Sequence, residues 1–354
     1  MIATGARFDP LLATARGHLA WAQVPWAHVT WFEEQSRYPL RLDLILSSRT
    51  ALLLAACTVA LLVALGVQRL LGNPHWPELG FFKRMAIGAP ALVAVQSAVT
   101  LVFYGVQPAL LSPAENLGAN LPGLLVGGLE VLVALTFITG LLDWAGATLL
   151  GALVLLSFFT AAPLDALSNL YWLGIAVTVF FIGRQAMEHG DLRPSLQRLG
   201  PAWSARAVAI LRVLTGIAIV APALREKIWD PELAGAFIGQ HPQFNLPRYY
   251  LGIAWFSDDR FVLAAGVAEA VIGVLLISGL MTRLVIVAMW VPFNITVPFL
   301  PPVELLGHLP IFAVMYVLLV HGAGIAPGEA AAAAGRLPGS PRLAADASGE
   351  PNSG

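Results

Sequence analysis

Long apolar stretches separated by short polar connections make up most of the chain between residues 49 and 322. A helix that crosses the hydrocarbon core of a bilayer needs roughly 20 mostly apolar residues. The pattern predicts such helices at 49–68, 84–105, 121–141, 145–162, 164–183, 206–224, 261–281, 283–300 and 304–322. The predicted fold class is therefore all-α, a polytopic transmembrane helical bundle of about nine spans.

The two ends of the chain differ from this helical region. Residues 1–43 contain acids and three tryptophans five positions apart, Trp21, Trp26 and Trp31, without the apolar core of a signal peptide. Tryptophan is typical of the headgroup level of a membrane, so we expect an interfacial segment there. Residues 324–354 are rich in Ala, Gly, Pro and Ser, a composition that indicates a disordered tail.

Composition supports a membrane protein and excludes other classes. Hydrophobic residues make up 58% of the chain and charged residues only 12%, with a net charge of -1. The lipid bilayer is thus the expected partner, and no nucleic acid is expected, because phosphate binding needs clustered Lys and Arg. The single cysteine, Cys57, excludes an internal disulfide, and the absence of HxH or HxxxH spacing gives no metal site.

Basic residues predict the orientation of the spans, because Lys and Arg are enriched in cytoplasmic loops. Basic residues are concentrated in four places. Arg69, Lys83 and Arg84 lie between the first two spans, and Arg184, Arg193, Arg198 and Arg206 lie between the fifth and sixth. Arg283 follows the seventh span, and Arg336 and Arg342 lie in the C-terminal tail. All of them fall on one side if the N-terminus is outside and the C-terminus is cytoplasmic. We therefore expect this orientation in a bacterial cytoplasmic (inner) membrane; the long connection 225–260, with both acids and bases, is the exception.

The chain also contains an internal repeat at an offset of 139 residues. Without a gap, this offset aligns Gly127 with Gly266, Glu130 with Glu269, Gly140 with Gly279, Pro163 with Pro302, Asp165 with Glu304, Asn169 with His308 and Gly183 with Gly322. Matching polar positions are informative, because apolar helices align easily. We predict two parallel four-helix repeats, 81–185 and 204–323, after an extra helix within 44–80.

Two aligned acids, Glu130 and Glu269, lie about nine residues into their predicted helices, near mid-bilayer. An ionised acid at the centre of a span costs ~3 kcal/mol on insertion scales, so each must be protonated, pair with a base, or line a wet cavity. Lys227 and Arg225 are the nearest bases in the second repeat, whereas "TLVFYGVQPALL" in the first repeat has none. A functional acid and a structural interhelical hydrogen bond are both compatible with this pattern.

The acids Asp165 and Glu304 begin the fourth helix of each repeat. Acids in a first helical turn are also favoured by the helix dipole alone. His308, one turn after Glu304, can equally hydrogen-bond a neighbouring carbonyl and do nothing else. These positions are therefore candidates rather than assigned sites.

The second repeat resembles the DoxX-like membrane proteins. The resemblance covers 204–322 well and 84–183 weakly, and its residues are Arg212, Gly216, Lys227, Asp230 and Pro231 of the first helix, Glu269, Gly279 and Arg283 of the second, and "GHLP" at 307–310. The first repeat departs from this pattern: it has no lysine, and Trp144 stands in the place of Arg283.

Membership of this family implies four-helix units that serve as subunits of quinone-linked redox systems or as membrane anchors of redox or thiol-stress enzymes. Applied here, the resemblance implies an accessory subunit that binds a quinone-like ligand, with the redox centre supplied by a partner protein. The expected binding or proton-relay residues are Lys227, Glu304 and His308 at the outer edge, Glu269 deeper, and Arg225 and Glu130. Structural roles are expected for Arg212, Arg283, Asp165 and Asn169.

Two other functions fit the same sequence. One is a transporter of a small solute or proton that uses Glu130 and Glu269 as a symmetric pair. The other is a structural membrane anchor that holds a partner protein through the aromatic-rich connection 225–260, which we expect to be partly helical. The sequence does not assign catalysis to the chain itself.

Overall fold

The computed structural model describes residues 38, 40–72, 76–183, 201–296 and 302–324. Within this part of the chain the elements are helices, accompanied by one isolated β-bridge between Ala109 and Asn116. Seven helical segments are long and apolar enough to cross a membrane, and Thr282–Asn294 and Leu305–His321 are shorter apolar helices. The prediction of an all-α fold is confirmed, and seven of the predicted spans correspond to helices that are candidates for crossing a membrane.

In chain order the described elements are η4 (Leu42–Leu46), α2 (Ser48–Leu71), α3 (Gly80–Met85), η5 (Ala86–Gly88), α4 (Ala89–Val106), α5 (Leu121–Thr139), α6 (Asp143–Thr160), α7 (Pro163–Ser168), α8 (Leu170–Phe181), α9 (Pro201–Pro222), η7 (Ala223–Ile228), α10 (Pro231–Gln240), η8 (Pro242–Phe244), α11 (Leu246–Tyr249), α12 (Asp258–Ser278), α13 (Thr282–Thr296) and α14 (Pro302–His321). Of these, η4, η5 and η8 are 3-10 helices and η7 is a π-helix.

Local signals set the ends of the long helices. The Ser47 side chain accepts a hydrogen bond from the first turn of α2, and the Asn120 side chain does the same for α5. Both helices end at a glycine with positive φ, Gly72 at 65° and Gly140 at 71°. Such N-caps satisfy free N–H groups, and a left-handed glycine closes the last turn, so these ends follow directly from the sequence.

The predicted boundaries change where a polar or special residue interrupts a helix. The span predicted at 84–105 is divided into α3, η5 and α4, and the one predicted at 164–183 is divided at Asn169 into α7 and α8. The span predicted at 206–224 continues as a π-helix to Ile228. In the span predicted at 283–300, α13 (Thr282–Thr296) contains Pro292, and residues 297–301 lie outside the described part of the chain. Most of the predicted interfacial segment 1–43 and of the tail 324–354 lies outside the described residues.

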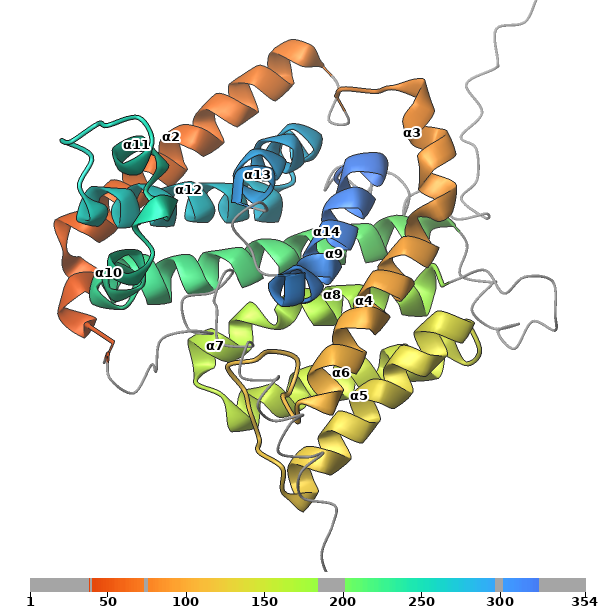
Figure 1. Cartoon of the computed structure of the whole chain (residues 1–354). Coiled ribbons are helices and arrows are strands. Elements are labelled where there is room, and N and C mark those ends of the chain that lie inside the picture. Colours follow the sequence, from red (N-terminus) through yellow and green to blue (C-terminus); the bar gives the residue numbers. More distant parts are fainter. Residues whose placement is uncertain (1–37, 39, 73–75, 184–200, 297–301, 325–354) are drawn as a thin grey trace, which may run out of the picture.

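The helices form two groups that pack on each other (Figure 1). In the first group α4 packs on α5, α5 on α6, and α6 on α8; in the second, α9 packs on α12, α12 on α13, and α13 on α14. The groups meet through two main contacts, α8 with α9 and α14 with α4. The fourth helix of each group thus packs on the first helix of the other, while α2 packs on α12.

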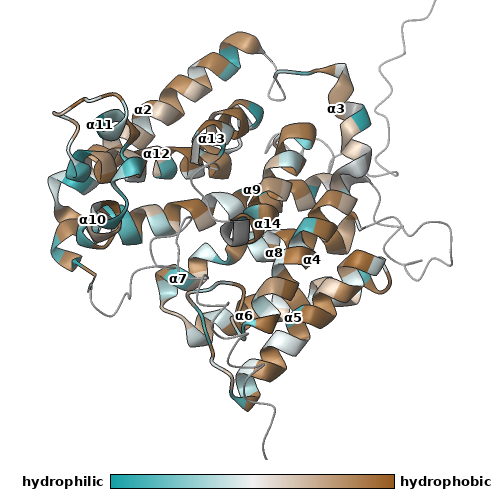
Figure 2. Ribbon diagram, viewed as in Figure 1, coloured by the Kyte–Doolittle hydropathy of each residue, from teal (hydrophilic) through white to brown (hydrophobic). Residues whose placement is uncertain are grey.

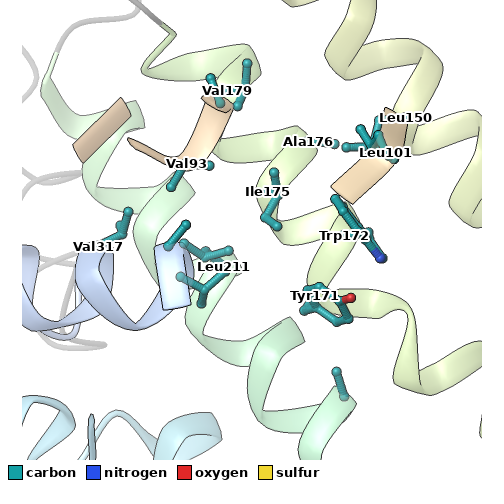
Figure 3. Packing of buried hydrophobic residues seen from close by; sticks show 14 of the residues in the cluster. Val93, Leu101, Leu150, Tyr171, Trp172, Ile175, Ala176, Val179, Leu211 and Val317 are labelled. Atoms are coloured by element: carbon teal, nitrogen blue, oxygen red, sulfur yellow. The ribbon is translucent and has the colours of Figure 1, made fainter. Parts of the chain in front are cut away.

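Large buried side chains fill the contact between the two groups. Ile175 of α8, Leu211 of α9, Val93 of α4 and Val317 of α14 lie there, as Figure 3 shows. Lipid tails are as apolar as these side chains, so close packing rather than water exclusion has to drive helix association in a bilayer. Tight interlocking at this junction is therefore the main interaction that holds the groups together.

The outer faces of the bundle are apolar as well. Figure 2 shows hydrophobic residues over the surface of α2, α5 and α6. Leu124 and Leu125 on α5 and Leu54 and Leu62 on α2 are among the exposed side chains. Monomeric soluble proteins rarely expose apolar surface of this extent, so these faces are suited to contact with lipid.

Candidate functional site

The C-terminal end of α9 continues into a π-helix, η7, that carries a run of buried charged residues. Its sequence, ALREKI, contains Arg225, Glu226 and Lys227, and all three side chains are buried. Pro222 precedes the run, and its missing N–H removes one α-helical hydrogen bond at this point. π-Turns are rare and occur frequently at functional sites, so η7 is the first place to look for chemistry.

The ammonium of Lys227 joins η7 to α12. Its Nζ lies 2.9 Å from Oε2 of Glu269 and 3.6 Å from Oε2 of Glu226. Gly266, one turn before Glu269, makes the approach possible, because a Cβ at that position would lie 2.8 Å from the Cβ of Lys227. The Glu269 side chain is 38% exposed and that of Lys227 only 11%, so the acid forms the accessible part of this pair.

The neighbouring Arg225 has a different partner. Its guanidinium lies 2.7 Å from Oδ2 of Asp230 and also donates to the backbone oxygen of Tyr38. Asp230 caps α10 by accepting from the N–H of Leu233. Burial raises the pKa of Asp230, and the hydrogen bond and charge of Arg225 act in the opposite direction. The pair of Arg225 and Asp230 joins the start of α10 to the end of η7, while Lys227 contacts Glu269.

In the first predicted repeat, Glu130 has a different environment from its counterpart. It is fully buried, and its Oε1 accepts a hydrogen bond of 2.7 Å from the backbone N–H of Leu111. Its Oε2 has no hydrogen-bond partner among the described residues. Gly127 packs against Gly105, whereas its counterpart in the second repeat, Gly266, packs against Lys227. No base therefore approaches Glu130 from the side of Gly105. Unlike Glu269, Glu130 has a backbone N–H and not a base as its hydrogen-bond partner among the described residues.

The loop that contacts Glu130 carries an acid that the sequence analysis missed. Glu115 accepts a hydrogen bond on Oε1 from Nδ2 of Asn169 and another on Oε2, at 3.4 Å, from the hydroxyl of Thr160. Burial raises its pKa to about 7; the hydrogen bonds from Asn169 and Thr160 lower it, and the charge of Asp165 raises it. Glu115 is the one acid in the connection 106–120, which has no Lys or Arg, and that isolation was the available signal.

The predicted outer-edge residues of the second repeat do not form one described cluster. The buried ring of His308 lies 5.9 Å from that of Phe293 and 6.5 Å from that of Phe312, whereas the described ionic contacts of Lys227 are to acids on η7 and α12. Glu304 lies on α14, but its side chain falls outside the description. Lys227 and Glu269 are therefore the predicted residues that the structure brings together.

Arg212 and Arg283 bind backbone oxygens at the opposite end of the bundle. Arg212 donates to the carbonyls of Leu276 and Ile277 and to that of Ala323, at 3.0 Å. Arg283 donates to carbonyls in the last turn of α14 and to that of Pro77. The last carbonyls of a helix lack partners within it, so both arginines cap helix ends and stabilise their negative dipole ends.

The donor set offers little to a metal ion. No group of three or more His, Cys, Asp or Glu within the described ranges could hold one, and Cys57 is a buried free cysteine. What the site offers is an ammonium beside a partly exposed carboxylate in apolar surroundings. That arrangement can donate and accept hydrogen bonds to an uncharged polar group.

Comparisons with known proteins give no assignment. No family model matches the chain, and neither a curated protein nor a solved structure matches it. The resemblance to DoxX-like proteins therefore stays a prediction based on the residues quoted above, and the function has to be argued from the site.

Proposed function

We propose that the chain is an integral membrane subunit of a redox system, and that it binds the polar head of a quinone-like ligand beside Lys227 and Glu269. The observation that carries this proposal is the 2.9 Å pair between Lys227 and a Glu269 that is 38% exposed, on a helix with apolar surroundings. Ionisable groups within spans are costly, and they commonly mark ligand or proton pathways.

The chemistry of the pair suits both forms of a quinone. A quinone carbonyl accepts a hydrogen bond, which the Lys227 ammonium can donate, because two of its three N–H groups suffice for Glu226 and Glu269. A quinol hydroxyl donates a hydrogen bond, which the exposed Glu269 carboxylate can accept. Reduction of a quinone takes up two protons and two electrons. Lys227 and Glu269 would hold or move the protons, and a partner redox protein would supply or receive the electrons.

The charges of the site place one ammonium between two carboxylates. Lys227 Nζ lies 2.9 Å from Oε2 of Glu269 and 3.6 Å from Oε2 of Glu226, while Arg225 pairs with Asp230. Glu269 is the more exposed of the two acids beside Lys227, so its carboxylate is the one that a quinol hydroxyl can reach and donate to.

The proposal includes the finer architecture predicted from the sequence. We infer about nine spans, arranged as two parallel DoxX-like repeats after an N-terminal helix, with the N-terminus outside and the C-terminus cytoplasmic in a bacterial inner membrane. The reciprocal packing of α8 on α9 and of α14 on α4 supports a duplication, because a pseudo-two-fold axis produces such paired contacts. The first repeat would then be the half without a working site.

Transport by a symmetric pair of acids is less well supported. Glu130 receives a backbone N–H and no base approaches it from α4, whereas Glu269 pairs with a lysine. Two acids with such different partners do not form equivalent binding sites for a proton or a solute. This asymmetry favours one ligand site, in the second repeat, over a shared pathway.

The test is to purify the protein in a mild detergent, extract lipid-soluble molecules, and identify them by mass spectrometry and visible absorption. The wild type, Glu269→Gln, Lys227→Met and the matched control Glu130→Gln are compared. We expect about one quinone per chain in the wild type and in Glu130→Gln, and little in the other two variants.

Two further measurements test quinone binding by the purified protein and proton transport. A short-chain quinone is added to each purified protein and its binding is followed by tryptophan quenching, so that loss during purification is not mistaken for lack of a site. Absence of a quinone and of quenching in every protein would overturn the proposal. Equal loss of proton flux into proteoliposomes for Glu130→Gln and Glu269→Gln would favour transport instead.

A further inference from the structure

We propose that the tip of the outer connection, residues 249–255, inserts into the headgroup layer of the bilayer that the chain itself spans. This aromatic tip would anchor the second helix group to phospholipid. The proposal depends on the chain being embedded in a membrane, and it is independent of the quinone site.

Four large side chains of the aromatic tip are exposed. Tyr249, Tyr250, Leu251 and Trp255 have exposed fractions between 53% and 71%. The rings of Tyr249 and Tyr250 pack edge to face, with centroids 4.9 Å apart, and the ring of Trp255 packs on Phe256 in the same manner. An exposed apolar patch of this size on a connection between helices is unusual for a surface that faces water.

The fold presents these side chains instead of burying them. On the inner side of the connection, Leu233, Phe237 and Phe244 pack with Val262 of α12 and form a separate small core. Asn245 fixes the turn, because its Nδ2 donates to the backbone oxygen of Phe256 at 3.0 Å and its Oδ1 accepts from the N–H of Arg248. Within the described residues, the side chains of Tyr249, Leu251 and Trp255 lie outside this small core and are exposed.

Position along the chain indicates lipid as the occupant. Trp255 is three residues before α12 begins, and α12 is long and apolar enough to cross a membrane. The tip therefore stays near the point where α12 leaves the hydrocarbon core. The same end of the molecule carries η4, with Leu42 and Leu46 exposed, so the apolar surface is not confined to one loop (Figure 1). Tyr and Trp are enriched at this level because one end of each ring is polar.

The charge at the tip fits a phospholipid phosphate. Arg260 lies with its Cζ 6.0 Å from the centroid of the Trp255 ring and donates to the backbone oxygen of Trp255 at 2.6 Å. Its neighbours are balanced, because Arg248 pairs with Asp258 and Asp259 pairs with Arg49. Arg260 thus adds a cation beside an interfacial tryptophan, the combination that snorkelling side chains use at a membrane surface.

The test measures the depth of a nitroxide label at Leu251→Cys. The label is placed in a Cys57→Ser background, and the protein is reconstituted in phosphatidylcholine nanodiscs with and without phosphatidylglycerol. Collisions with oxygen, which concentrates in the bilayer, are compared with collisions with a water-soluble nickel chelate. A label at Glu232→Cys, whose side chain is exposed on α10, is the matched control.

We expect the label at 251 to collide several-fold more with oxygen than with the chelate, and the label at 232 to show the reverse. Arg260→Gln should reduce the response to phosphatidylglycerol without changing the control. The proposal is overturned if the labels at 251 and 232 have the same accessibility to the chelate, which would leave the tip to a protein partner. A second label at Tyr250→Cys repeats the test if the first variant folds poorly.

Discussion

The ion pair between Lys227 and Glu269 should be coupled energetically, and a double-mutant cycle measures that coupling. The variants are Lys227→Met, Glu269→Leu and the double variant, which keep the side-chain size similar. Removing one partner of a fully buried ion pair costs roughly 3–5 kcal/mol, because the remaining charge is left without compensation. Glu269 is 38% exposed, so the pair is not fully buried and the expected cost is lower than this range.

The expected magnitudes follow from the partners each variant leaves behind. Lys227→Met removes the ammonium that contacts both Glu226 and Glu269, and we expect a loss of about 2–3 kcal/mol in the free energy of unfolding. Glu269→Leu leaves Lys227 with Glu226 at 3.6 Å, so the expected loss is about 1–2 kcal/mol. The double variant should lose about as much as Lys227→Met alone, which corresponds to a coupling of roughly 1–2 kcal/mol.

The assay is equilibrium unfolding in mixed micelles, in which the fraction of an anionic detergent is increased and helix content is followed. A matched control is the exposed pair Arg248→Met and Asp258→Asn, whose coupling should stay below about 1 kcal/mol because water screens surface pairs. Additive losses for Lys227 and Glu269, within about 0.5 kcal/mol, would refute the reasoning that the pair forms a coupled site.

Three further predictions concern other parts of the molecule. Glu115 has a pKa raised to about 7 by burial, so its protonated form stabilises the fold below about pH 4.5 and that contribution is lost as the pH rises through 7. Glu115→Gln should therefore match the wild type in thermal unfolding at pH 5 and exceed it at pH 8, by up to about 3 kcal/mol; parallel pH profiles would contradict this. Gly105→Ala places a Cβ 2.6 Å from the carbonyl oxygen of Gly127 and should cost about 1–3 kcal/mol in the same assay, whereas Gly128→Ala, with open space around it, should have little effect. Arg212→Met removes the donor to carbonyls at the ends of α12 and α14, and faster amide exchange should appear at those two ends while the rest of the bundle stays protected.

The sequence by itself determined where the helices lie and that they suit a lipid bilayer. Apolar runs of the length of a bilayer, with Ser47 or Asn120 before a helix and Gly72 or Gly140 after it, are local features, and the helices begin and end accordingly. For Glu130 and Glu269 the sequence limited the options to a protonated acid, a pair with a base or a wet cavity, because a charge in a span has few stable environments. These predictions needed no knowledge of which helix neighbours which.

Tertiary structure alone decided which polar side chains contact one another. Lys227 pairs with Glu269, which is 42 positions away, rather than with the nearby Asp230. Arg212 donates to the carbonyl of Ala323, which is 111 positions away. In water, the apolar face of a helix identifies the side that packs inward. In a bilayer, lipid satisfies every apolar face equally, so the hydrophobic pattern does not specify which faces meet.

The same reason explains a residue that sequence reasoning missed. Glu115 joined Asn169 only once the loop 107–120 had folded over the first helix group. The described ring contacts of His308 are with Phe293 and Phe312, and its role beside Lys227 stays a prediction. The membrane-facing pattern determined the spans, and close packing between particular helices determined which polar groups came together.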